Sequence, residues 1–143
     1  MRVLGIDFGQ RRIGLAMSDA SGTLATPVRT IERQDADIDL VTLVVQAIQE
    51  MGRDERIDQL VVGLPRRLDG SDNDQTPRVR AFAAALELRS GLPVELQDER
   101  LTSRAAEERL ALRDRDWRKR KARLDAAAAA IVLQDWLDTR RGQ

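Results

Sequence analysis

Acidic residues stand where two predicted strands end and where a predicted helix begins. Asp7 ends an apolar run near the start of the chain, Asp98 and Glu99 follow a second short run, and Asp125 opens the last helical segment. In an open α/β sheet, ligands bind beyond the carboxyl ends of the strands, so these acids can converge. Successive strand side chains point to opposite faces, so only one of Asp98 and Glu99 is expected to join Asp7.

Converging carboxylates repel one another, and proteins tolerate this chiefly where a divalent cation is bound. The chain contains no His and no Cys. Oxygen ligands without His or Cys favour Mg²⁺ or Mn²⁺ over zinc. Sites of this kind characteristically transfer phosphoryl groups, because metals activate water and stabilise the leaving oxygen. The acids therefore indicate metal-dependent phosphoryl transfer.

Each acid also has a simpler interpretation. Asp7 can cap the turn that follows it, and Asp125 can lie favourably in the first turn of a helix. Glu99 can form a surface ion pair with Arg100 or Arg104. The residues alone leave these alternatives open.

Basic side chains fall near the same predicted sheet edge, although the formal net charge of the chain is zero. Arg11 and Arg12 follow the first strand, Arg67 follows the fourth, and residues 113–123 carry seven positive and two negative charges. Arginines around a metal site suit a phosphodiester substrate. Trp117 either offers a stacking surface for a base or packs into the core.

The hydrophobic pattern predicts a single α/β domain over residues 1–143, with an antiparallel meander of three strands followed by strands alternating with helices. Pro27 places the third strand at an edge of the sheet. The predicted strands span residues 2–7, 13–18, 25–31, part of 57–64, and 94–97. The predicted helices span residues 38–51, 76–89, 103–112 and 124–137. This order implies a mixed sheet with helices on both faces.

Capping residues suggest where the helices begin and end. Asp35 or Asp37 is expected to cap the first helix, and Gly52 to end it. Thr76 is expected to cap the second helix, with Pro77 as its first residue. The longest apolar run, residues 126–133, is too short to span a bilayer, and no leader segment is visible, so a cytoplasmic location is expected.

Ordered motifs along nearly the whole chain resemble those of the YqgF family, also called RuvX, whose members are described as pre-16S rRNA nucleases and are related to Holliday-junction resolvases. The motifs lie at residues 5–9, 12–16, 18–19, 62–65, 69–71, 79–80, 82–83, 98–102, 119–121, 125 and 127–128. The loop after Pro65 departs from the family pattern, because Arg66 and Arg67 stand where an asparagine is frequent. That departure bears on substrate preference more than on chemistry.

The resemblance implies an RNase H-like fold, a five-stranded mixed sheet flanked by helices. It also implies catalytic, metal-binding acids at Asp7, Glu99 and Asp125, with Mg²⁺ or Mn²⁺ as cofactor. Asp98, next to Glu99 in the chain, is a further candidate acid, and the residues leave open which of the two faces the metal. The expected phosphate contacts are Arg11, Arg12, Arg67, Arg118, Lys119, Arg120 and Lys121.

The leading hypothesis is a metal-dependent nuclease that matures the 5′ end of pre-16S rRNA, with structured RNA and pre-ribosomal particles as partners. A second is a Holliday-junction resolvase acting on branched DNA, for which a two-fold homodimer is expected; the sequence leaves monomer and homodimer open. A third is an actin-like sugar kinase or ATPase, which needs a second domain. A fourth is a non-catalytic nucleic-acid-binding or ribosome-binding module.

Overall fold

Five strands form one mixed sheet in the computed structural model, which describes residues 1–9, 12–32, 39–99, 103–119 and 126–141. The strands are β1 (Val3–Phe8), β2 (Arg12–Ser18), β3 (Ala25–Glu32), β4 (Gln59–Leu64) and β5 (Val94–Asp98). Their order across the sheet is β3-β2-β1-β4-β5. Neighbouring strands among β1, β2 and β3 pair antiparallel, whereas β4 runs parallel to β1 and to β5. This confirms the predicted five-stranded mixed sheet, and Pro27 lies on the edge strand β3.

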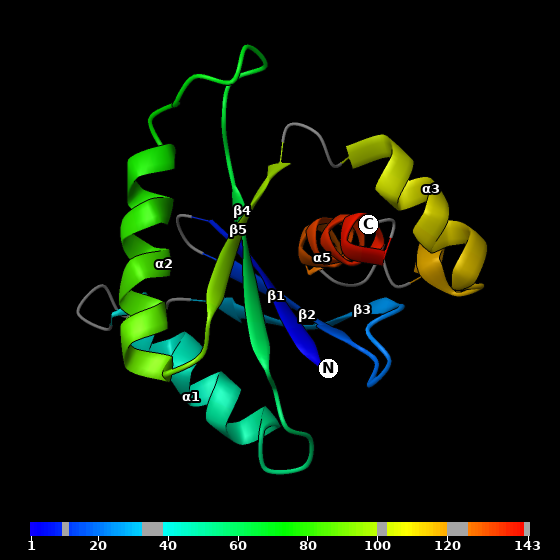
Figure 1. The fold of residues 1–143 in the computed structure, drawn as a ribbon, viewed down its shortest axis with the longest axis horizontal. Coiled ribbons are helices and arrows are strands. Elements are labelled where there is room, and N and C mark those ends of the chain that lie inside the picture. Colours follow the sequence, from blue (N-terminus) through cyan, green and yellow to red (C-terminus); the bar gives the residue numbers. More distant parts are fainter. Residues whose placement is uncertain (10–11, 33–38, 100–102, 120–125, 142–143) are drawn as a thin grey trace.

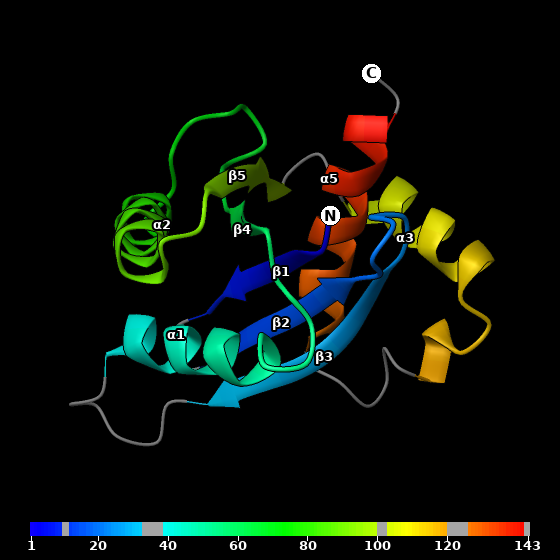
Figure 2. The same cartoon turned by 60° about the horizontal axis from the view of Figure 1, so that its bottom comes forward.

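Helices cover both faces of the sheet, as predicted (Figures 1 and 2). They are α1 (Leu40–Met51), α2 (Thr76–Ser90), α3 (Ser103–Arg113) and α5 (Ala127–Arg141). Helices α1 and α2 lie against one face, and α5 lies against the other with α3 beside it. None of these helices is long and apolar enough to cross a membrane.

The sheet separates two apolar clusters. Leu4 and Ile6 of β1 belong to the cluster under α1 and α2, whereas Val3 belongs to the cluster under α5. β1 is therefore buried on both faces, as expected for a strand in the middle of a sheet covered by helices on both sides. Gly5 lies under α5, and a Cβ atom there would lie only 2.7 Å from the Cβ of Leu133. The missing side chain lets α5 approach β1 closely.

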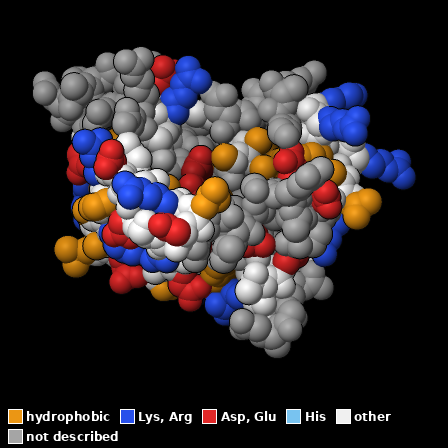
Figure 3. Space-filling model, turned by 90° about the horizontal axis from the view of Figure 1, so that it is seen from above, with side chains coloured by type: hydrophobic (Ala, Val, Ile, Leu, Met, Phe, Trp, Pro, Cys, Tyr) orange, Lys and Arg blue, Asp and Glu red, His pale blue; other side chains and the backbone are white. Residues whose placement is uncertain are grey.

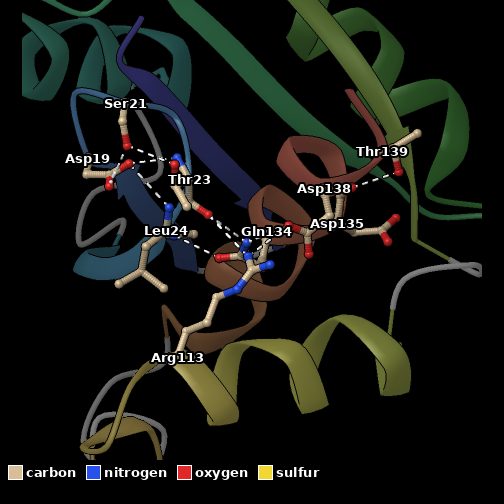
Figure 4. Close-up of polar contacts among 10 residues, drawn as sticks. Asp19, Ser21, Thr23, Leu24, Arg113, Gln134, Asp135, Asp138 and Thr139 are labelled. Atoms are coloured by element: carbon tan, nitrogen blue, oxygen red, sulfur yellow. Dashed lines mark hydrogen bonds and ion pairs between the residues drawn. The ribbon is translucent and has the colours of Figure 1, made fainter. Parts of the chain in front are cut away.

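A buried glutamine fixes α5 to the edge of the sheet (Figure 4). Gln134 is fully buried; its Oε1 accepts a hydrogen bond from the Ala25 backbone N–H at 2.9 Å, and its Nε2 donates to the Thr23 carbonyl at 3.0 Å. Arg113 at the end of α3 donates to Asp138 Oδ1 at 2.9 Å. These contacts join α3, α5 and the start of β3, so they set the position of α5 over the sheet.

Two predicted N-caps are wrong. The residue that caps α1 is Asp39, whose side chain accepts a hydrogen bond from a backbone N–H of the first turn, not Asp35 or Asp37. Thr76 lies within the first turn of α2, after the N-cap Gln75, and is fully buried. At the start of α2, the Asn73 side chain accepts hydrogen bonds from the backbone N–H groups of Gln75 and Thr76, so it does the capping that was expected of Thr76.

The last helix lies later in the chain than predicted. It runs from Ala127 to Arg141 rather than over residues 124–137. The added turn includes Asp138, whose Oδ1 accepts hydrogen bonds from Arg113 of α3 and from Gln134.

Candidate active site

Asp7 lies at the carboxyl end of β1, on the face covered by α5. It pairs with Gly14 of β2, and because Ile6 pairs with Val62, it lies beside Gly63 of the parallel strand β4. Side chains alternate along a strand, so Asp7 shares its face with Gly5, over which α5 packs. Glycines therefore flank Asp7 on both neighbouring strands, and they leave space above the sheet around its carboxylate.

Glu99 follows β5 directly and reaches back over the sheet into this space. A Cβ atom on Gly63 would collide with Oε1 of Glu99 and would lie 3.0 Å from its Cγ. The Glu99 carboxyl group forms a hydrogen bond with Asp7. The structure therefore brings Glu99 together with Asp7. The sequence alone did not decide whether Asp98 or Glu99 would be the acid beside Asp7.

The environment raises the pKa of the Glu99 carboxyl group from 4.5 to about 8. Burial is the largest cause, followed by the hydrogen bond to Asp7 and the negative charges of Asp7 and Asp98. Two close carboxylates cannot both ionise cheaply, so a proton stays on the pair at neutral pH. A bound cation would replace this proton and remove the repulsion.

Asp98 lies on the opposite face of the sheet. Its neighbour Gln97 donates to Asp135 of α5 at 2.7 Å, so Asp98 points toward the face of α1 and α2. Its Oδ2 lies 3.6 Å from Nη1 of Arg66 in an ion pair whose side chains are 18% and 28% exposed. The structure therefore places Asp98 with Arg66 rather than beside Asp7.

The described part of the acidic site is a pair rather than a triad. Across the described ranges, no group of three or more acidic side chains is arranged to hold a metal ion. The remaining predicted acid, Asp125, lies outside those ranges, so its role stays a prediction. The same applies to Arg11, Arg120 and Lys121.

The other predicted phosphate contacts are exposed. Arg12 begins β2, Arg67 follows β4, and Arg118 and Lys119 follow α3 in the chain. Figure 3 looks onto the side of the molecule where β4 and β5 end, and Lys and Arg side chains appear at several places around it among Asp and Glu side chains. These cations are accessible to a polyanion.

The stacking role considered for Trp117 is wrong. Its ring is only 2% exposed and packs with Leu110 and α5 in the cluster under that helix. Its Nε1 lies 3.4 Å from Oε1 of Glu107. A base cannot reach a ring buried in this way, so the indole stabilises the fold instead.

Gly63 is the residue of this site that sequence reasoning missed. It has no chemistry of its own, but Glu99 occupies the space that a side chain there would fill. The available signal was a glycine inside an otherwise apolar strand, which often marks a close approach of another group.

The chain matches the RuvX family, described as Holliday junction resolvase, over residues 1–139. The chain belongs to this family. A relative from Maridesulfovibrio salexigens is 45% identical over 96% of this chain and 98% of its own length, and one from Moorella thermoacetica is 43% identical over 100% and 98%. Both relatives carry the name "Putative pre-16S rRNA nuclease".

Solved structures of resolvases share the fold of this family member. RuvC of T. thermophilus in complex with a Holliday junction substrate has a TM-score of 0.57 at 17% identity and aligns over 99% of this chain and 96% of its own. The fowlpox virus Holliday junction resolvase has a TM-score of 0.54 at 12% identity, over 98% and 99%. At these identities the similarity supports the fold alone.

Proposed function

We propose that this chain is a metal-dependent nuclease that hydrolyses phosphodiester bonds in structured RNA, and that it matures the 5′ end of pre-16S rRNA within pre-ribosomal particles. The observation that carries the proposal is the contact between Asp7 and Glu99 over Gly63, where β1, β4 and β5 end. The names of the relatives support the choice of RNA.

The acidic pair fits a hard divalent cation, because a positive charge beside Asp7 and Glu99 would offset both the burial and the repulsion that keep a proton on Glu99. Asp7, Glu99 and Asp125 would hold Mg²⁺ or Mn²⁺ there. When bound, the metal would lower the pKa of the attacking water and stabilise the leaving oxygen. The absence of His from the chain agrees with this mechanism, since no histidine serves as general base.

The chain's own cations bind and orient the substrate in this mechanism. Arg12 lies at the start of β2, next to the strand that carries Asp7, and Arg67 lies beyond the end of β4. Both are exposed, as are Arg118 and Lys119. Each phosphate contact releases counterions, so we expect RNA affinity to fall steeply with salt concentration.

Asp7→Asn tests the mechanism. It removes the charge but keeps the size of the side chain, so we expect cleavage of a pre-16S RNA fragment to be lost while RNA binding and thermal stability stay close to wild type. Asp54→Asn, at an exposed turn, is the matched control and should cut normally. Full activity of Asp7→Asn, in a preparation free of other nucleases, would refute the mechanism.

Cleavage of branched DNA is the second candidate, favoured by the family description and by the fold shared with RuvC. An RNA-precursor assay beside a four-way-junction assay, each with Mg²⁺ and with Mn²⁺, separates the two. Symmetric cuts in a junction need a two-fold dimer, which sedimentation measures. Tight binding without metal-dependent cleavage of either substrate would instead favour a non-catalytic binding module.

A further inference from the structure

Residues 65–75 join β4 to α2 and project beyond the edge of the sheet where β4 ends (Figures 1 and 2). We call this segment the arm. At its base, Arg66 pairs with Asp72 in an antiparallel bridge, and the Arg66 guanidinium lies 3.6 Å from Asp98 at the end of β5. Asp72 also forms an ion pair with Arg80 of α2 at 2.9 Å. The arm is therefore braced against both the sheet and α2.

The tip of the arm is a tight turn. The Gly70 backbone N–H donates to the Arg67 carbonyl at 2.9 Å, and Gly70 has a φ of 91°, which favours glycine. Asp69 accepts hydrogen bonds from the backbone and the hydroxyl of Ser71 at 2.9 and 2.6 Å. Leu68 stands at the corner of this turn and is 91% exposed. A short, internally bonded turn thus presents one apolar side chain to solvent.

Single exposed leucines are common, so the exposure of Leu68 alone means little. Leu88 on α2 and Leu112 on α3 are similarly exposed, at 85% and 87%. Leu68 differs in its setting, because it adjoins the exposed Arg67 and tops an arm that begins two residues after Gly63. Of these three leucines, Leu68 is the one that lies a few residues along the chain from Gly63, over which Glu99 packs.

The length of the chain limits how far Leu68 can lie from the acids. Leu68 follows Gly63 by five positions, and an extended chain spans at most about 3.6 Å per residue, so the two Cα atoms lie within about 18 Å. Leu68 is therefore confined to the surroundings of the sheet edge where β4 ends and where Asp7 and Glu99 meet. Leucine is one of the apolar side chains that DNA-bending proteins insert between base steps to unstack them, and the bases of an RNA helix are stacked in the same manner.

We propose that Leu68 is a wedge that inserts at a base step of the structured RNA substrate, close to the scissile bond, while Arg67 holds the adjoining phosphate. This inference rests on the nuclease function proposed above. The ion pair between Arg66 and Asp98 at the base of the arm supports a wedge role for Leu68, since an inserted side chain must keep its position against the bases that it separates.

The test uses the full-length protein and an RNA hairpin with a single-stranded tail, carrying 2-aminopurine at successive positions around the cut. Ca²⁺ in place of Mg²⁺ slows cleavage during the measurement. We expect wild type to raise the fluorescence several-fold at one or two neighbouring positions. Leu68→Ser should abolish the rise and slow cleavage in Mg²⁺ about tenfold, a barrier change of about 1.4 kcal/mol. Leu68→Met should keep both, and Leu88→Ser and Leu112→Ser should behave as wild type.

The wedge is refuted if wild type unstacks no position, if Leu68→Ser keeps the fluorescence rise, or if Leu88→Ser loses it equally. Anisotropy measures binding separately, so a loss of affinity in Leu68→Ser is distinguished from a loss of unstacking at saturation. A wild-type protein that cuts RNA while Leu68→Ser still unstacks it refutes the wedge alone. A wild-type protein that neither binds nor cuts RNA overturns both the wedge and the proposed function.

Discussion

Replacing Gly63 with alanine tests whether the missing side chain at this position makes room for Glu99. Gly63 is not among the glycines with positive φ, so its backbone accepts alanine. By restricting the unfolded chain, such a change alone stabilises a protein by about 0.4–1 kcal/mol. In this protein, however, the new Cβ would occupy the space of Glu99 Oε1. The sign of the effect therefore depends on whether Glu99 is present.

The expected magnitudes follow from these opposing effects. Overpacking costs about 1–3 kcal/mol, so Gly63→Ala should lower the free energy of unfolding of wild type by about 1–2 kcal/mol. In a Glu99→Ala background the obstacle is gone, and the same change should raise the free energy of unfolding by about 0.5 kcal/mol. The coupling between the two positions is then about 2 kcal/mol, within the range for residues in contact.

Urea denaturation of wild type, both single variants and the double variant measures this coupling. The experiment is done at pH 6 without divalent cations, where Glu99 is protonated and bonded to Asp7. Gly5→Ala is the matched control, because its Cβ meets Leu133 rather than Glu99 and its cost should be equal in both backgrounds. A Gly63→Ala cost that is unchanged by Glu99→Ala, or a Gly63→Ala protein that is more stable than wild type, would refute the reasoning.

Further predictions concern pH and the buried indole. Because the pKa of Glu99 is raised from 4.5 to about 8, the native state loses stability as pH rises through this window. Glu99→Gln should therefore raise the free energy of unfolding at pH 9 in EDTA by about 2 kcal/mol, after discounting for partial exposure, and change it little at pH 5. At Asp19, burial raises the pKa, but hydrogen bonds from Thr23 and Leu24 outweigh it and lower the pKa overall. Asp19→Asn should consequently destabilise the protein at pH 7 and progressively less as pH falls through that lowered pKa; an equal cost at pH 2 and pH 7 in urea titrations would contradict this. Trp117→Ala should cost about 3–5 kcal/mol of stability by thermal unfolding, yet leave RNA affinity unchanged in the cold, because the ring is buried.

The sequence predicted that a second acid would lie beside Asp7, but it did not predict which acid. The alternation of strand side chains limits the acid beside Asp7 to one of Asp98 and Glu99. The decision depends on the register of β4 and β5, in which Leu64 pairs with Asp98, and on the empty space above Gly63. Register between distant strands is a tertiary property, and hydrophobic patterning does not encode it.

The errors at helix ends and at Trp117 have one physical origin. Asp35, Asp37 and Asp39 are all suitable N-caps by residue type, so residue type alone does not identify Asp39, the one that caps α1. Trp117 stands in a strongly basic segment, but its neighbours in space are Leu110 and helix α5. Local composition describes the surface of that segment, whereas the burial of its one aromatic residue depends on a helix later in the chain.

The central position of β1 affects how the acidic pair arises as the protein is made. β1 pairs early in synthesis only with β2, since β4, β5 and α5 follow later in the chain. The hydrogen bond from Ala25 to Gln134 joins residues 109 positions apart, so it can form only when nearly the whole chain has been synthesised. A growing chain therefore displays Asp7 without Glu99 beside it. The acidic pair therefore cannot form until at least the first 99 residues have been synthesised.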